Sequence, residues 1–365
     1  MSEAAPFAFA PDGGVFAAGD GPELLVWKAD GAPLWKVFTD GLLVALAMTV
    51  EEVITLDADG RVGRYRRADG EYIDGFELGD RPFDLRAAPT GLLGVATARG
   101  VVFVDASGQR REIAHPGLTA FAFGPDGASV GLGTGSGTFT AVELASGAAW
   151  GAVALPGPIG AVGWSALGTW VVGAGASLHR VKGDGGAVTR SLPPADAPIT
   201  AVAVSSNGLV AAAVAGDHVE LYELAGDKPL GAFVLRRVIG GVAFGNGHRL
   251  GIGLDDGDAS VVDVATTDSV RTEPHPGRGR NTWRVESKVD LMAVRGALAT
   301  MMAGGQPIAR YVPPPQSAEP ESRTMGCLGG CAGVVGVVLV LAVFCAGIGL
   351  VVYFARMYGV WVPGR

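Results

Sequence analysis

The feature that most constrains the fold of this chain is a repeat of about 40 residues. The segment "FAFAPDGGVFAAGDGPELLVWKADGAPLW" begins at Phe7, and "FAFGPDGASVGLGTGSGTFTAVELASGAAW" begins at Phe121. Each contains an alternating apolar stretch, a Pro-Asp-Gly turn, a second stretch, a Gly turn, a third stretch, another turn and a Trp. Related segments begin at Ala161, Ala201 and Gly241. Short runs with period-2 alternation, bounded by turn residues, predict β-strands.

The last residue of each opening strand gives a marker for the period. Successive markers are 39, 39, 36, 41, 40 and 40 residues apart, at Phe9, Met48, Ala87, Phe123, Trp164, Val204 and Phe244. Units of this length with about four short strands are typical of propeller blades. One small sheet cannot bury its own apolar faces, whereas blades packed in a ring bury them against their neighbours. We therefore predict an all-β, seven-bladed β-propeller over residues 1–278, with eight blades as the alternative.

Glycine is abundant, at 58 of 365 residues, and follows no three-residue period, which excludes a collagen-like chain. The glycines fall between short apolar runs and are interpreted as turn residues. Hairpin turns need residues with positive φ, and six pairs supply them: Asp12-Gly13, Asp30-Gly31, Asp59-Gly60, Asp69-Gly70, Asp126-Gly127 and Asn207-Gly208.

On these residues the chain resembles WD40-like and PQQ-like β-propellers over roughly residues 7–278. The usual WD40 Gly-His and Trp-Asp pairs are absent, and "VWKADG" at Val26 resembles that pattern only in part. The segments "ADGAPLW" (Ala29–Trp35) and "ASGAAW" (Ala145–Trp150) resemble the Trp-containing blade ends of quinoprotein-type repeats. Because one fold hosts many functions, the resemblance implies the architecture and not an activity.

Residues 279–312 begin within a polar stretch, His275–Lys288, and allow two interpretations. One is an irregular extra blade or ring-closing segment, with turns at Arg295-Gly296 and Gly304-Gly305. The other is a helix capped by Ser287, with Leu291, Val294, Leu298 and Met301 along one face. Strands are favoured, because Gly296 would cost a helix about 1 kcal/mol.

The end of the chain has a different composition. Residues 313–331 form a Pro-rich linker and a juxtamembrane segment, and no charged residue occurs between Thr324 and Ala355. A bilayer span needs about 20 apolar residues, so residues 332–355 are predicted to form a transmembrane helix. Tyr353, Tyr358 and Trp361 are typical of a membrane interface, and Arg356 ends the apolar run before a short tail, 356–365.

The N-terminal "MSEAAPFAFAPDGG" lacks the basic and apolar regions of a signal peptide, which predicts a single-pass membrane protein with a cytoplasmic propeller. Cys327 and Cys331 are either S-acylation sites or small apolar residues near the interface. A helix-mediated dimer is a further possibility, because small residues lie four apart at Gly329 and Gly333, Ala342 and Ala346, and Cys345 and Gly349.

The charge of the chain argues against nucleic-acid binding, since the net charge is −8 and the sequence pI is about 5.2. The sequence contains no HExxH, GxSxG or GxxxxGK[ST] motif. Its histidines are dispersed, with His115 and His275 in equivalent "HPG" corners, His179 and His218 on third strands and His248 in a turn. We predict no catalytic, cofactor-binding or metal-binding residue, and no cofactor.

Three segments carry residues of the kind that ligand sites use. "GLGTGSGT" (Gly131–Thr138) resembles a phosphate loop, but "FTAVEL" follows it in place of the required helix, which favours a hairpin between a second and a third strand. "LDADG" (Leu56–Gly60) and "LDDGDAS" (Leu254–Ser260) offer carboxylates for Ca²⁺ but lack the 12-residue loop with its bidentate Glu. Both are interpreted as the same hairpin turn in two blades.

These observations favour a non-catalytic, membrane-tethered propeller that serves as a protein–protein interaction platform. The alternatives are a propeller enzyme or quinone-cofactor protein on the extracytoplasmic side, and a small-ligand sensor that binds in the channel. A composition rich in Ala, Gly and Arg is typical of a GC-rich bacterial genome.

Overall fold

Short apolar runs that end at Gly turns form antiparallel strands along the whole described part of the chain. The computed structural model describes residues 5–79, 81–192, 195–205, 208, 210–235, 239–245, 248–254, 259–264, 269–271 and 286–287. All of them lie in one compact unit, Met1–Arg310. The six predicted turn glycines, Gly13, Gly31, Gly60, Gly70, Gly127 and Gly208, all have positive φ.

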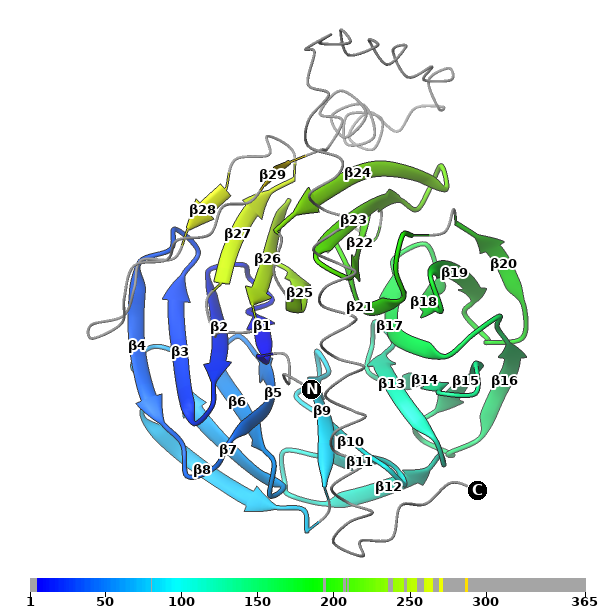
Figure 1. The fold of residues 1–365 in the computed structure, drawn as a ribbon. Helices are drawn as coiled ribbons and strands as arrows, with labels where there is room; N and C mark the ends of the chain where they lie inside the picture. Colours follow the sequence, from blue (N-terminus) through cyan, green and yellow to red (C-terminus); the bar gives the residue numbers. More distant parts are fainter. Residues whose placement is uncertain are drawn as a thin grey trace, which may run out of the picture. The chain divides into compact units, whose positions relative to one another are not determined.

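The strands form seven sheets, each built from four consecutive strands, and in Figure 1 the sheets follow one another around a ring. The first three blades are β1 (Phe7–Phe9), β2 (Val15–Asp20), β3 (Glu23–Lys28) and β4 (Pro33–Phe38); β5 (Leu43–Met48), β6 (Glu52–Asp57), β7 (Arg61–Arg66) and β8 (Tyr72–Glu77); and β9 (Pro82–Ala87), β10 (Leu93–Thr97), β11 (Gly100–Val104) and β12 (Arg110–Ala114).

The next two blades are β13 (Leu118–Phe123), β14 (Ser129–Thr134), β15 (Thr138–Glu143) and β16 (Ala149–Ala154), and β17 (Ile159–Ser165), β18 (Thr169–Ala174), β19 (Ser177–Lys182) and β20 (Val188–Ser191). The last two are β21 (Ile199–Val204), β22 (Val210–Ala215), β23 (His218–Glu223) and β24 (Lys228–Val234), and β25 (Ile239–Phe244), β26 (Arg249–Leu254), β27 (Ala259–Asp263) and β28 (Ser269–Arg271). The seven-bladed, all-β prediction is confirmed. Six markers end their opening strands as expected, and Ser165 extends the fifth by one residue beyond Trp164.

A short strand, β29 (Glu286–Ser287), pairs with the outer strand β24 and makes the sixth sheet five-stranded. The rest of the predicted extra blade or ring-closing segment, residues 279–312, lies outside the described residues. The predicted linker, transmembrane helix and tail, residues 313–365, also lie outside them. Within the described ranges, no helix has the length and hydropathy that a membrane span requires.

Glycines in the middle of second strands let neighbouring blades approach closely. A Cβ on Gly94 of β10 would lie 2.8 Å from the Phe121 ring, and one on Gly131 of β14 would lie 2.8 Å from the Trp170 ring. Gly173 of β18 lies in the same way against Ile199. A glycine inside a strand often marks such a close approach of another element. Interpreting the glycines as turn residues was therefore correct for only part of them.

The ring closes where the first blade packs against the seventh. Phe7 and Phe9 of β1 lie over Gly251 and Gly253 of β26, where a Cβ would lie 2.5 Å from an atom of the Phe7 side chain. Phe9 packs with Phe16, whose ring stacks on Trp27 at 5.4 Å, and this cluster continues to Ala259 and Val261 of β27. We call the contact between Phe7 and Phe9 and the glycines of β26 the closure seam.

Candidate functional site

A cavity of about 270 Å³ runs between the first strands of all seven blades and forms the central channel. Five of the first strands carry a small residue at an equivalent position, which leaves room for the channel. Each of these residues directly follows a register shift in its strand: Ala45, Ala120, Ala161, Ala201 and Gly241. Polar side chains reach it from Asp84, Arg86, Thr119 and Thr200. The Asp84 carboxylate lies 3.1 Å from Arg86 Nε, so part of this charge is neutralised within β9.

One end of the ring exposes large apolar side chains near the connections between blades. Phe38 ends β4 with 67% of its surface exposed, Leu42 directly precedes β5 with 58% exposed, and Phe83 of β9 lines the channel with 38% exposed. Lys36 Nζ lies 5.8 Å from the centre of the Phe38 ring and 3.9 Å from the carboxylate of Glu23. All three apolar residues stand where a fourth strand connects to the next blade. We call Phe38, Leu42 and Phe83 the apolar face.

Neighbouring blades are also joined at the hairpins between their third and fourth strands. The carbonyl of the residue that directly follows the third strand accepts a hydrogen bond from the preceding blade. Trp35 Nε1 donates to the Arg67 carbonyl at 2.8 Å, an Arg111 guanidinium nitrogen donates to the Leu144 carbonyl, and one of Arg180 donates to the Leu224 carbonyl at 2.7 Å. The same backbone acceptor is therefore used at three junctions by an indole and two guanidinium groups.

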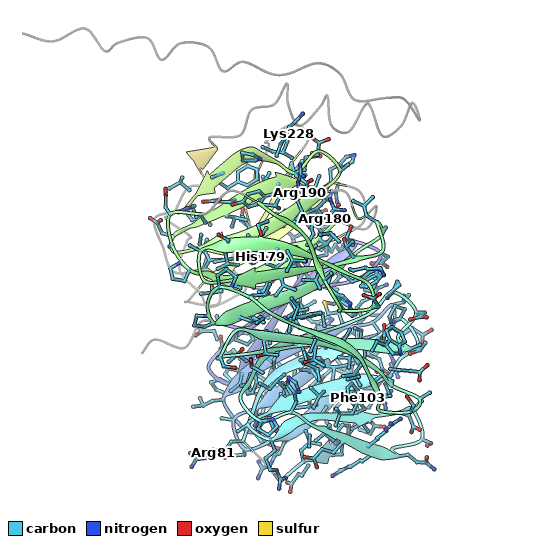
Figure 2. All side chains as sticks on the ribbon, turned by 90° about the vertical axis from the view of Figure 1, so that its right-hand side faces the viewer. Arg81, Phe103, His179, Arg180, Arg190 and Lys228 are labelled. Carbon is cyan, nitrogen blue, oxygen red and sulfur yellow. The ribbon has the colours of Figure 1, made fainter. Side chains whose placement is uncertain are left out.

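The junction between the fifth and sixth blades adds charge to this arrangement. Asp227 lies 2.9 Å from Arg180 and 2.9 Å from Arg190, and these arginines lie together near Lys228 in Figure 2. Among the described residues Asp227 is the one non-glycine with positive φ, at 52°. Gly70 and Gly147 hold the matching place in their hairpins, just before the fourth strand pairs again. Asp is one of the few residues that tolerate this conformation.

The two Trp-containing blade ends do not behave alike. Trp35 pairs with Val26 on β3 and docks on the second blade, where its ring would lie 2.7 Å from a Cβ on Gly70. In the fourth blade the matching position, opposite Ala141, is Gly151. Trp150 falls one residue earlier, at the register shift, and is 48% exposed. Because a shift of one residue turns a side chain to the other face of the strand, only Trp35 docks between blades.

The described histidines are not brought together. His179 lies on the third strand β19, as predicted, and its Nδ1 lies 2.8 Å from the Ser191 hydroxyl. His218 opens the third strand β23 between the carboxylates of Asp217 and Glu220, and His248 lies in the connection before β26. His115 follows β12, and its Nε2 is buried without a hydrogen-bond partner. His275 lies outside the described residues.

Burial lowers the pKa of His179 below its ordinary value of 6.5. The side chain is 3% exposed, and its Nε2 has no hydrogen-bond partner. Protonation of His179 therefore favours the unfolded chain, in which its pKa is ordinary. The folded state keeps its full stability above pH 6.5, and this stability falls as the pH drops from 6.5 towards the lowered pKa of His179. His115 is shifted in the same direction by the same cause.

Replacing His179 by Asn is expected to weaken this pH dependence. Urea unfolding followed between pH 7.5 and 5.0 should show a smaller loss of stability for His179→Asn than for the wild type, because one of the groups that must charge on unfolding has been removed. Leu167→Asn changes an exposed side chain that does not titrate, so it is the control and should keep the wild-type slope. Equal slopes for wild type and His179→Asn would contradict the prediction.

Two of the three candidate ligand segments, Gly131–Thr138 and Leu56–Gly60, form hairpins. The Thr134 hydroxyl accepts a hydrogen bond from the Thr138 amide across the β14–β15 connection, which makes Gly131–Thr138 part of a second-to-third-strand hairpin. Asp57 accepts hydrogen bonds from the amides of Asp59 and Arg61 between β6 and β7. Residues 255–258 of the other acidic segment lie outside the described residues. The described residues contain no group of three His, Cys, Asp or Glu placed to hold a metal ion.

Comparison with known proteins identifies the fold of this chain. No family model matches the chain, and no curated protein sequence matches it. Among solved structures, the Cps50 (Swd1) β-propeller domain of Myceliophteria thermophila is similar, with a TM-score of 0.62 over 72% of this chain and 97% of that one. The two sequences are 12% identical, so the likeness shows the fold alone. The chain thus contains a WD40-like, seven-bladed β-propeller.

Proposed function

We propose that the protein is a membrane-tethered interaction platform whose propeller binds a partner protein through the apolar face. The exposure of Phe38, Leu42 and Phe83 at one end of the ring carries this proposal, because exposed large apolar side chains are typical of interaction sites. Aromatic residues are also enriched in the buried centres of interfaces. The proposal is further supported by the contacts between blades. The close approach at the second-strand glycines and the hydrogen bonds to carbonyls of the next blade hold these side chains on a rigid ring.

Tethering is supported by the sequence of residues 332–355, which is long and apolar enough to span a bilayer. A tether would confine the apolar face to the membrane surface and raise its effective concentration towards other membrane proteins. In this proposal the propeller faces the cytoplasm, and protease protection on sealed membranes reports the side on which it lies.

The apolar face can be tested by charge substitution. Phe38→Asp combined with Leu42→Asp is expected to remove a partner that co-purifies in stoichiometric amounts with the tagged full-length chain, because a buried unpaired carboxylate opposes association. Val50→Asp is the matched control, since Val50 is 57% exposed but lies in a first-to-second-strand turn at the opposite end of its blade. The control should retain the partner.

Two results would count against the platform. One is the absence of any stoichiometric partner for the wild type after in-cell cross-linking. The other is an equal loss of the partner from both variants, which would move the interface away from the apolar face.

Tethering has a separate test. The wild-type chain is expected to remain with membranes after carbonate extraction, whereas Leu339→Arg combined with Val343→Arg should be extracted, because each central Arg costs a span about 2.5–3.5 kcal/mol. Protease protection on sealed membranes then reports the side of the propeller. A wild-type chain that carbonate releases would contradict tethering and leave the interaction proposal to its own test.

A further inference from the structure

The connection from the first blade to the second, Phe38–Leu42, is held by hydrogen bonds to both blades. The Thr39 amide donates to the Pro22 carbonyl at 2.8 Å, and the Thr39 hydroxyl lies 2.9 Å from the same oxygen. The Ala58 amide donates to the Leu42 carbonyl at 2.9 Å. The connection is therefore fixed between the β2–β3 turn of the first blade and the β6–β7 turn of the second.

A glycine in this connection allows it to lie directly on the second blade. A Cβ on Gly41 would overlap the Asp57 carboxylate. Asp57 is 4% exposed, and its Oδ1 accepts hydrogen bonds from the amides of Asp59 and Arg61 at 3.0 and 2.8 Å. Because Asp57 is fixed in its own turn, the connection above it has one defined position, and so do the side chains that it exposes.

Three alternate side chains of the connection are exposed. Phe38 is 67% exposed, Leu42 is 58% exposed, and Asp40 lies between them and is also exposed. The Cα atoms of Phe38 and Leu42 are at most about 14 Å apart, because each residue extends the chain by about 3.6 Å or less. A partner segment of a few residues can therefore contact the two apolar side chains and the carboxylate together.

The surface around this connection is negatively charged. The two turns that hold it add three carboxylates, those of Asp20, Asp57 and Asp59. Neither the turns nor the connection contain a Lys or Arg. The flanking cations are already paired, Lys36 with Glu23 at 3.9 Å and Arg61 with Glu77 at 3.2 Å. Among the described residues, no Lys or Arg forms an ion pair with Asp40, so its charge is available to a partner.

We propose that the Phe38–Leu42 connection binds a segment of a partner protein in which an Arg or Lys lies between two apolar side chains. This inference rests on the proposed function, because it gives the chemistry of the partner that the apolar face binds. The apolar side chains cover Phe38 and Leu42, and the cation pairs with Asp40. An acidic segment would bring like charges together, and a purely apolar one would bury the Asp40 carboxylate without a partner, so both are disfavoured.

The test measures the binding of fluorescein-labelled peptides to the full-length chain in phosphatidylcholine nanodiscs by fluorescence anisotropy, with empty nanodiscs as the background. The peptide Gly-Ser-Leu-Arg-Phe-Ser-Gly is expected to bind saturably. Peptides with Glu in place of Arg, or with Ala in place of both Leu and Phe, should bind at least about tenfold more weakly, which corresponds to about 1.4 kcal/mol. In Asp40→Lys the Glu peptide should bind more tightly than the Arg peptide, because the charge between the two apolar side chains is reversed.

Glu112→Lys makes the same reversal of charge at an exposed position of the outer strand β12, so it is the control and should keep the wild-type order of the peptides. Absence of saturable binding to the wild type, or an unchanged order of the peptides in Asp40→Lys, would overturn this inference. The proposed function has its own readout. If Phe38→Asp combined with Leu42→Asp removes a co-purifying partner while the peptides show no charge preference, the apolar face remains the interface and only the chemistry assigned to its partner is wrong.

Discussion

Trp170→Ala is expected to lower the free energy of unfolding by about 3–5 kcal/mol, the range for removing a fully buried aromatic side chain. Trp170 has no exposed surface and contacts the ring of Trp164 edge-on at 4.6 Å. It lies against Gly131 and Phe139 of the fourth blade, and its Nε1 donates to the Gly183 carbonyl at 2.9 Å. The substitution removes packing on both sides of one junction, which explains the size of the effect.

Two variants separate the contributions of Trp170. Trp170→Phe keeps an aromatic ring but loses the hydrogen bond to Gly183, so it should cost clearly less than Trp170→Ala. Trp150→Ala is the control with the same change of residue type, and because Trp150 is half exposed it should stay within about 0.5 kcal/mol of the wild type. Chemical denaturation of the full chain, followed by circular dichroism, measures all three. A cost below about 1 kcal/mol for Trp170→Ala would contradict this account.

The strand pattern of the blades was predictable from the sequence because it depends on local chemistry. Each opening strand alternates, and each ends before a turn residue, so the markers from Phe9 to Phe244 fall at or next to strand ends. The turn glycines have positive φ for the same local reason. Ring formation also followed from the sequence, since seven small sheets have no other way to bury both faces.

The contacts between blades were not predictable, because they depend on strand register. Trp35 and Trp150 follow Asp-Gly and Ser-Gly turns in similar segments, but the register shift in each blade places only Trp35 at the junction. The hydrogen bonds to the carbonyl after the third strand have no sequence motif either, because their donors, Trp35, Arg111 and Arg180, differ chemically. A motif search looks for one residue type, whereas here the shared partner is a backbone atom.

The candidate site was invisible in the sequence for a related reason. The channel is lined by residues from all seven first strands, so its members are spread along the chain at the blade period and share no residue type. No motif marks Phe38, Leu42 and Phe83 in the sequence, and their exposure becomes apparent only from their places at or next to the ends of strands. That Arg111 holds the position of Trp35 becomes apparent only when two junctions are compared through their strand pairs.

Gly251→Ala is expected to destabilise the protein by about 2–3 kcal/mol by overpacking the closure seam. A Cβ at this position would lie 2.5 Å from Cζ of Phe7 and 2.6 Å from Cδ2 of Phe9, and neither ring can withdraw freely because both pack in one aromatic cluster. At this seam the described strands of the first and seventh blades join through side-chain packing, since β1 and β25 belong to different sheets. Overpacking here should therefore loosen the closure of the ring.

A matched glycine and a double-mutant cycle make this prediction specific. Gly241 also faces Phe7, but a Cβ there would lie 3.6 Å from Phe7 Cβ, an ordinary contact, so Gly241→Ala should be neutral within about 0.5 kcal/mol. Phe7→Ala alone should destabilise the chain, yet it should reduce the added cost of Gly251→Ala, because the ring that clashes is gone. Additive costs in the double variant, or equal costs for the two glycines, would show that the seam does not depend on this close approach. In that case, limited proteolysis of Gly251→Ala should cut a blade other than the first, and the cleavage site would locate the loss of stability elsewhere in the ring.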